Sequence, residues 1–237
     1  MRLHLCCKAL CLASVFATSS LAQTISEING INYLSPFREQ SVSDVAGLVT
    51  AKGPKGVWIR STTPDDDPRT SESIYVYTDD DPPLDVSVGD NIVISGQVAE
   101  YRATPDNLFL TEIVSPRLVT IESSDNPVEP VEISSDNIYP PGQQYSSLDG
   151  GNVFGRPNNV NQVSIENPEL KPEEYGMDFW ESLVGELVTL KNARAISRPN
   201  RFGDTWVVGD WNPSGVNERG GLTMTDKGLY SKTSIIN

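Results

Sequence analysis

The sequence predicts an all-β chain made of two small Greek-key barrels of the oligonucleotide-binding (OB) type, joined by a proline-rich connector. Three observations lead to this fold class. Short runs of β-branched and aromatic residues follow one another from residue 45 onward, Gly, Pro and Asp separate these runs, and the first run recurs later in the chain. The composition, 38% hydrophobic and 21% charged, is that of an ordinary globular protein.

The first 22 residues have the features of a secretory signal peptide. A cationic start containing Arg2 and Lys8 precedes an apolar run at residues 9–16 and a small-residue cleavage site at residues 20–22. No later apolar run approaches the roughly 18 residues of a membrane span. We therefore expect a secreted, extracellular product without a membrane anchor.

Removal of the signal peptide also removes every cysteine and the only histidine, so several kinds of catalytic and metal site become impossible. The only cysteines are Cys6, Cys7 and Cys11, and the only histidine is His4. Disulfides, zinc sites built on Cys or His, thiol nucleophiles and Ser-His-Asp triads are therefore excluded from the mature chain. The net charge of -14 opposes binding to polyanions unless cations are concentrated locally.

Residues 23–122 are expected to form the first barrel. Gly96 lies inside the longest strand-like run, at a place where a barrel strand bends sharply. An immunoglobulin-like sandwich is the competing architecture. The strand-like runs cover residues 45–52, 56–61, 73–78, 91–101 and 108–113, with 117–121 as a sixth run or an extension of the fifth.

Residues 123–172 are rich in Pro, Ser, Asn and Gly, and they read as an extended connector. Because this stretch also contains aromatic residues such as Tyr139, we expect part of it to lie against a domain surface. A short helix is expected over residues 172–183, since Pro172 suits a first helical turn and the following glutamates favour its positive end.

The first strand-like run has a second copy. Residues 45–52 align without gaps on residues 184–191, with five identical positions in eight. In both places a turn and a tryptophan followed by an aliphatic residue come next, at Trp58 and Trp206. Residues 173–237 should therefore hold the short helix and a second OB-like barrel.

This second barrel is expected to be incomplete. Nothing after residue 184 corresponds to the run at residues 88–98. A barrel without its last strands would leave open edges and an uncovered core. We therefore expect either another form of closure or a chain that is the front part of a longer protein, as in a truncated gene model.

Several motifs follow one another in a fixed order, and together they are moderately specific. They are Gly-Leu-Val-Thr-Ala-Lys at 47–52 with Gly-Val-Trp-Ile at 56–59, Val-Gly-Asp at 88–90 with Ser-Gly-Gln-Val-Ala-Glu-Tyr at 95–101, and Asp-Phe-Trp-Glu-Ser-Leu at 178–183. With the signal peptide, this set resembles the amino-terminal region of secreted fungal and bacterial nucleases of the endonuclease/exonuclease/phosphatase family. The resemblance covers nearly all of residues 23–237.

The resemblance implies a secreted, DNA-degrading parent protein whose catalytic domain lies further along the chain. In that family the catalytic domain hydrolyses phosphodiesters with a divalent metal, using histidines, acidic residues and asparagines. Residues 23–237 contain no histidine, so no catalytic residue is assigned and this chain alone is expected to be inactive. It would need no cofactor itself, since Mg²⁺ or Mn²⁺ would belong to the missing catalytic domain, its covalently continuous partner.

Two basic windows are the candidate contacts to single- or double-stranded DNA, which we expect to bind weakly. Residues 51–60 and 187–202 carry cations and no acid, and both fall where OB barrels bind single strands. Exposed tryptophans there would contribute on the order of 1–3 kcal/mol per stacked base, whereas core tryptophans and solvated cations are the alternative. The candidate nucleic-acid-binding residues are Lys52, Lys55, Trp58, Arg60, Lys191, Arg194, Arg198, Arg201 and Trp206.

The acidic residues suggest weaker hypotheses. Two acidic runs, at residues 65–67 and 79–81, could hold calcium as loops do in extracellular proteins, but solvated loop tips explain them better because no EF-hand spacing is present. Asp178 and Glu181 would share one helical face. Charges near a helix start explain them better than the facing acids of glycoside hydrolysis.

Two functions from different classes follow from these observations. The first is a non-catalytic accessory region of a secreted nuclease, which positions nucleic acid or supports the catalytic domain. The second is an independent extracellular module that binds carbohydrate or cell wall through exposed aromatic residues. Salt separates them, since binding to phosphates weakens steeply with salt and stacking on sugars does not. A scaffold without any ligand is a third possibility.

Overall fold

The computed structural model describes residues 22–78, 84–105, 107–141, 147, 160–201 and 203–211. The predicted signal peptide, except for its last residue, and the acidic run at residues 79–81 lie outside the described residues. Within them the chain is mainly β with three short helices, so the predicted all-β class is confirmed. No described helix has both the length and the apolar character needed to cross a membrane.

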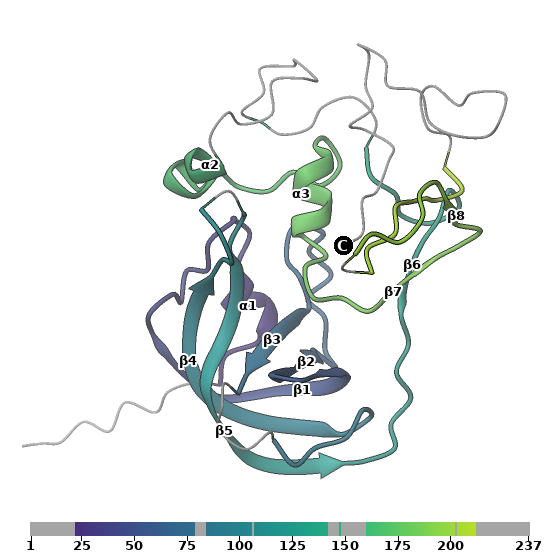
Figure 1. The fold of residues 1–237 in the computed structure, drawn as a ribbon. Helices are drawn as coiled ribbons and strands as arrows, with labels where there is room; N and C mark the ends of the chain where they lie inside the picture. The colour runs from purple at the N-terminus through teal and green to yellow at the C-terminus, as the bar shows by residue number, and fades with distance from the viewer. Residues whose placement is uncertain are drawn as a thin grey trace, which may run out of the picture.

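The first barrel is confirmed, and its strands match the predicted runs closely. Each strand pairs with the next in the order β1-β2-β3-β5-β4, and β4 returns to pair with β1, so the sheet closes. All pairings are antiparallel except that of β3 with β5, which is the OB arrangement (Figure 1). The five strands are β1 (Ser41–Gly53), β2 (Gly56–Arg60), β3 (Ser73–Tyr77), β4 (Asn91–Tyr101) and β5 (Leu110–Ser123), whose last part is the predicted extension.

Alternating apolar residues fill the interior of the barrel. Val57 and Ile59 of β2 are buried, and they join a core cluster to which every strand of the barrel contributes. Gly96 sits at a register shift between β4 and β5, where an added Cβ would lie 2.4 Å from the Cγ2 of Ile113. The predicted bend at Gly96 is therefore confirmed as a site where only glycine fits.

A short helix that the sequence analysis did not predict contributes to this core. Helix α1 (Ile25–Asn29) begins with a capping box in which Thr24 and Glu27 satisfy each other's backbone amides. Its residues Ile25 and Ile28 are fully buried in the barrel cluster. Because Asn29 also donates to the carbonyls of the β3 region, α1 is fastened to the barrel.

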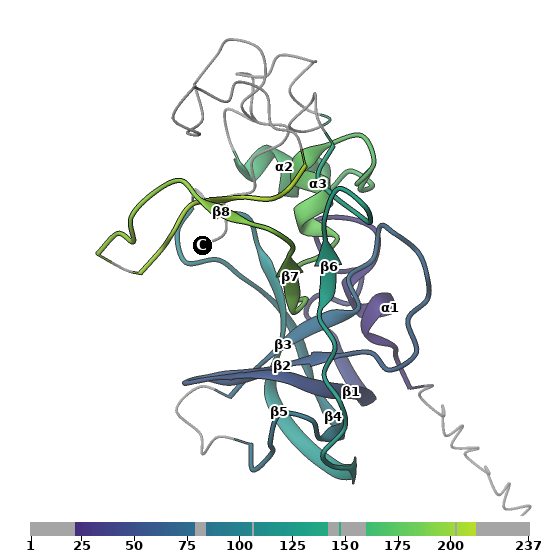
Figure 2. The same cartoon turned by 90° about the vertical axis from the view of Figure 1, so that its right-hand side faces the viewer.

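The remaining elements lie beside the barrel (Figures 1 and 2). Strand β6 pairs in parallel with β7, and β8 pairs antiparallel with β9. Part of the predicted connector is therefore structured, since it contains β6 and α2. The elements are β6 (Val131–Ile133), α2 (Val160–Glu166), α3 (Gly176–Glu181), β7 (Val188–Leu190), β8 (Arg194–Ala195) and β9 (Val207–Val208).

The structure differs here from the prediction of a second barrel. Among the described residues after 172, β7 pairs only with β6, and β8 pairs only with β9. Residues 212–237 lie outside the described part. Gly185 adopts a φ of 80°, which is outside the extended region, and within the predicted copy only residues 188–190 form a strand. The sequence repeat at residues 184–191 is therefore not a repeat of strand pairing.

Helix α3 is also shorter than predicted. It covers Gly176–Glu181 within the expected range of residues 172–183, and residues 172–174 form turns instead. Two further apolar clusters hold these elements in place. Tyr33 packs with residues of α2 and α3, while Phe179 of α3 packs with Ile133 and Trp211.

Candidate functional site

The outer face of β2 and β3 carries a row of aromatic side chains. Trp58 and Tyr75 are register partners, with ring centroids 4.7 Å apart, and Tyr77 follows at 6.4 Å from Tyr75. They point outward because Val57 and Ile59 take the inward positions on β2. This is the face on which OB barrels present stacking surfaces to single strands.

A later segment of the same chain crosses one end of this face. An added Cβ at Gly185 would lie 2.6 Å from the Trp58 ring, so the backbone of the crossing segment rests on the indole. Next to it, Arg60 donates to Glu186 at 2.8 Å, and the Glu186 side chain is only 3% exposed. Ser71 donates to the carbonyl of Val184 at 2.7 Å. We call residues 183–186 the crossing segment.

The structure places the predicted nucleic-acid residues in three different settings. Trp58 and Arg60 are engaged by the crossing segment. Lys52 donates to the carbonyl of Val86, and Lys191 forms an exposed ion pair with Glu132 at 3.4 Å. The remaining candidates are the exposed cations Lys55, Arg194, Arg198 and Arg201 and the half-buried Trp206.

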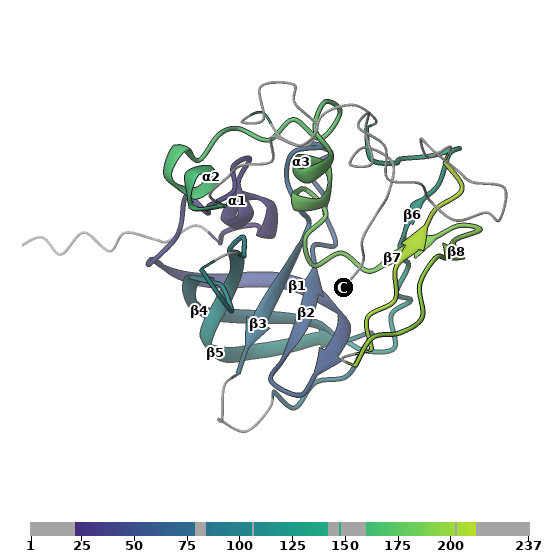
Figure 3. The same ribbon diagram turned by 45° about the horizontal axis from the view of Figure 1, so that its top comes forward.

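The two basic windows lie on different sheets. Residues 51–60 belong to the β1–β2 hairpin of the barrel, whereas residues 187–202 run through β7 and β8 beside it (Figure 3). Phe202, the aromatic residue at the end of the second window, lies outside the described residues. The sequence predicts that the two windows occupy the same place in two copies of one barrel. The described strand pairing does not show such an equivalence.

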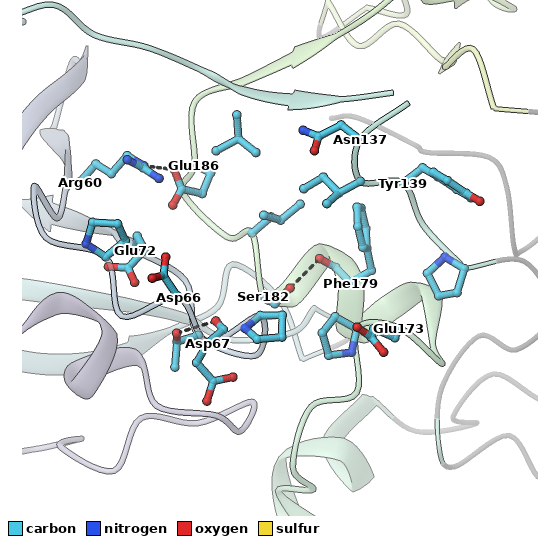
Figure 4. A pocket seen from close by; sticks show the side chains of 18 residues that line it. Arg60, Asp66, Asp67, Glu72, Asn137, Tyr139, Glu173, Phe179, Ser182 and Glu186 are labelled. Carbon is cyan, nitrogen blue, oxygen red and sulfur yellow. Dashed lines mark hydrogen bonds and ion pairs between the residues drawn. The ribbon is translucent and has the colours of Figure 1, made fainter. Parts of the chain in front are cut away.

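A cavity of about 740 Å³ lies between the barrel, α3 and the segment after β6. We call it the groove (Figure 4). Its apolar walls come from α3, the crossing segment and the segment after β6, with prolines on several sides. Tyr139 is 45% exposed at the groove, whereas Phe179 is 6% exposed and packs edge-on against Trp180. The volume is within the range of small-ligand sites.

The charged side chains of the groove are mostly acidic. Glu186 is paired with Arg60, and Asp67 is paired with Arg69 at 2.6 Å. Glu72 is different: it is 8% exposed, its Oε1 accepts from the Asp65 amide at 2.7 Å, and its Oε2 has no hydrogen-bond partner. Burial raises the pKa of Glu72, and the nearby Asp65 charge adds to the effect.

A second set of acids lies near the interface between the barrel and α3. Burial raises the pKa of Glu112 to about 7, with the charge of Glu100 as the second cause. Glu100 accepts from Ser35 and Thr111, and burial raises its pKa also. Asp178 of α3 is fully buried and accepts from Tyr33 at 2.5 Å. Burial is the first cause of the raised pKa of Asp178, and the hydrogen bond from Tyr33 acts in the opposite direction.

The described residues do not include a group of three or more Asp, Glu, His or Cys side chains that could hold a metal ion. In the acidic run at residues 65–67, Asp65 accepts from the amide of Asp67 and from Thr70, so it stabilises its own loop. These residues therefore do not fit a calcium loop or the divalent metal of the resembled nucleases.

Sequence reasoning missed the groove. Glu72 stands alone in the sequence between Ser71 and Ser73, and nothing in its spacing marks it as a buried acid. Tyr139 was expected against a domain surface, and it does lie at the groove, but its partners come from residues distant in the chain. A signal that could have helped is the density of prolines around residues 64–68 and 140–141.

Fold and site together define an OB-type barrel, a second part docked beside it, and a groove between them. The docked part consists of the described residues from β6 onward. Residues 132–236 match a family described as a domain of unknown function (DUF8508). The match begins within β6 and leaves out the whole barrel, so its edge coincides with the change from barrel to docked part. The comparisons with curated proteins and with solved structures gave no match.

Proposed function

We propose that this chain is the non-catalytic module of a secreted nuclease, and that its barrel supports a catalytic domain rather than gripping DNA. The observation that carries the proposal is the occupied β2–β3 face. Where OB barrels stack single strands, Trp58 and Arg60 contact Gly185 and Glu186 of the same chain. The nuclease context rests on the family resemblance of the ordered motifs.

The residue types support a role without catalysis. After residue 22 the chain has no imidazole and no thiol, and its described acids do not gather into a metal-ligand set. The net charge of -14 further disfavours tight binding of a polyanion. Within the described part of the two basic windows, exposed cations such as Arg194 and Arg198 remain to attract phosphates.

DNA titration tests the proposal directly. Purified residues 23–237 should not cleave a labelled single-stranded oligonucleotide with Mg²⁺ or Mn²⁺ present. Binding measured by fluorescence anisotropy should stay in the non-specific range of roughly 10⁻⁴–10⁻⁶ M at physiological salt and weaken as salt rises. Metal-dependent cleavage by this chain would refute the proposal.

Two variants separate a structural tryptophan from a stacking one. Trp58→Ala should lower the free energy of unfolding by about 2–4 kcal/mol, because the crossing segment loses the ring on which it rests, and should leave the weak DNA binding unchanged. Changing Lys191 and Arg198 together to Glu should abolish that binding without lowering stability. If Trp58→Ala instead removes DNA binding and leaves stability intact, the β2–β3 face is a DNA site.

The groove favours a second candidate, a module that binds neutral carbohydrate. Tyr139 offers an exposed ring, and Asn137 and the carboxylates of the groove could accept or donate hydrogen bonds to hydroxyls (Figure 4). Against it, the second aromatic residue, Phe179, is buried and offers no free face for sugar stacking. Titration with a neutral chitin or glucan oligosaccharide tests this candidate, and Tyr139→Ala should abolish any binding found.

A further inference from the structure

We propose that the groove binds an organic cation, a guanidinium or ammonium group on an apolar stem, with Glu72 and Asp66 as its counter-charges. This inference does not rest on the proposed role in a nuclease. It starts from the one groove side chain that is buried and incompletely hydrogen-bonded, Glu72.

A buried carboxylate oxygen without a donor is unusual and costs free energy. More than nine-tenths of Glu72 is buried, and its Oε2 has no hydrogen-bond partner among the described residues. Leaving a buried acceptor unsatisfied is unfavourable, and more so for a charged group. Glu72 lines the groove, so a donor on a bound ligand would satisfy this oxygen (Figure 4).

The charged side chains around the groove indicate which kind of hydrogen-bond donor a ligand should carry. Its one cation, Arg60, is engaged by Glu186, and the carboxylate of Asp67 is engaged by Arg69. Asp66 lines the same groove, is exposed, and has no ion pair among the described residues. The charges left without a partner are therefore negative, which favours a positively charged donor over a neutral hydroxyl.

The walls of the groove indicate the kind of chemical group to which the cation is attached. Ile138, Leu183 and the prolines that line the groove give apolar surface, and Tyr139 gives an exposed ring. Methylene stems pack on apolar surface while the charged end reaches a carboxylate, and a guanidinium also stacks on an aromatic face. Lysine or arginine side chains of a peptide and free polyamines share this chemistry.

The experiment compares matched ligands on the mature chain by isothermal titration calorimetry. The peptide probe is an acetylated tripeptide amide with arginine between two leucines, its neutral twin carries citrulline instead, and spermidine is the free-polyamine probe. The arginine peptide or spermidine should bind. The citrulline twin should bind at least about tenfold more weakly than the arginine peptide, since it lacks the charge that strengthens the hydrogen bond to a carboxylate. Which of the two cations binds better identifies the source of the ligand.

Two variants assign the binding to the proposed carboxylates. Glu72→Gln keeps an oxygen acceptor for the Asp65 amide and removes the charge. Asp66→Asn keeps the backbone, because Asp66 has a φ of 62° and asparagine tolerates that conformation best. Each should weaken cation binding about tenfold or more. Glu132→Gln removes the same charge outside the groove and should change nothing.

Three results would overturn the inference. The first is equal binding of the arginine and citrulline peptides. The second is an equal loss of cation binding in Glu132→Gln and in Asp66→Asn. Such a result would mean that the overall negative charge of the chain attracts the cation, without a specific site in the groove. The third is binding of neither cation, whether or not a neutral oligosaccharide binds. If Glu72→Gln fails to fold, Asp66→Asn decides the matter.

Discussion

Burial raises the pKa of several acidic residues of this chain, to about 8 for Glu181 and to about 7 for Glu112. Glu112 lies on β5 next to Tyr75 of β3, is 6% exposed, and has a pKa of about 7. Between the ordinary pKa of a glutamate and pH 7, the folded chain therefore holds a proton that the unfolded chain releases. The folded state must lose stability as the pH rises through this window.

This linkage gives a prediction for Glu112→Gln. The free energy of unfolding of the wild-type chain should fall as the pH rises from about 4.5 to about 7, and Glu112 alone should account for roughly 1–3 kcal/mol of that fall. The variant should show a shallower decline and should be the more stable protein at pH 8, as measured by urea unfolding at pH 5 and pH 8.

The exposed Glu129 supplies the control for this prediction. Glu129→Gln removes the same charge from a loop and should leave the pH profile unchanged. The decline should not disappear entirely in Glu112→Gln, because burial also raises the pKa values of Glu100 and Asp178. Parallel pH profiles for the wild type and Glu112→Gln would contradict the account of Glu112 as a protonated buried acid.

At the scale of elements, the crossing segment decides how the two parts of the chain meet. Gly185 combines a φ of 80° with a position directly over Trp58. Gly203 has a similar φ of 92°, but among the described residues no atom beyond its chain neighbours lies within 4 Å of the place where its Cβ would be. The two glycines therefore have similar backbone demands and differ in their surroundings.

This difference gives a matched pair of substitutions. Gly203→Ala should cost about 1 kcal/mol of unfolding free energy from backbone conformation alone. Gly185→Ala should cost about 2–4 kcal/mol, because the added methyl group also meets the Trp58 ring. Urea unfolding measures both values. Equal losses would mean that the crossing segment moves away from the barrel at little cost.

The same elements show what a sequence can and cannot reveal. The barrel strands could be predicted because Val57 and Ile59 alternate with outward residues, and this local pattern survives folding. The second barrel could not be predicted correctly, because Gly185, the second residue of the copy at residues 184–191, has a left-handed conformation. Gly185 also lies directly against the Trp58 ring, a contact with a distant residue that no pattern in the copy records.

The candidate site was predicted less well than the fold, for a related reason. The sequence places Trp58 and Arg60 on the second strand of the barrel, but their partners Gly185 and Glu186 are more than a hundred residues away. The groove depends on the same long-range docking. Its buried Glu72 has no local signature, since its burial comes from the way distant elements pack.

For the whole molecule, the contacts between the two parts predict a single cooperative unit. Tyr33 of the N-terminal segment donates to Asp178 of α3, and Arg60 of the barrel pairs with the buried Glu186. Removing one partner from a buried charged pair leaves an uncompensated charge, so neither part can unfold without a large cost to the other. The barrel and the docked part should therefore unfold together.

This cooperativity can be measured with the variant Trp58→Phe. Its remaining tryptophans, Trp180, Trp206 and Trp211, all lie outside the barrel, so their fluorescence follows the docked part. Far-ultraviolet circular dichroism follows mainly the barrel strands. The urea midpoints of the two signals should coincide, as they do in two-state unfolding. Separate midpoints would show that the parts are independent domains, and the groove between them would then lack the rigid walls that a binding site requires.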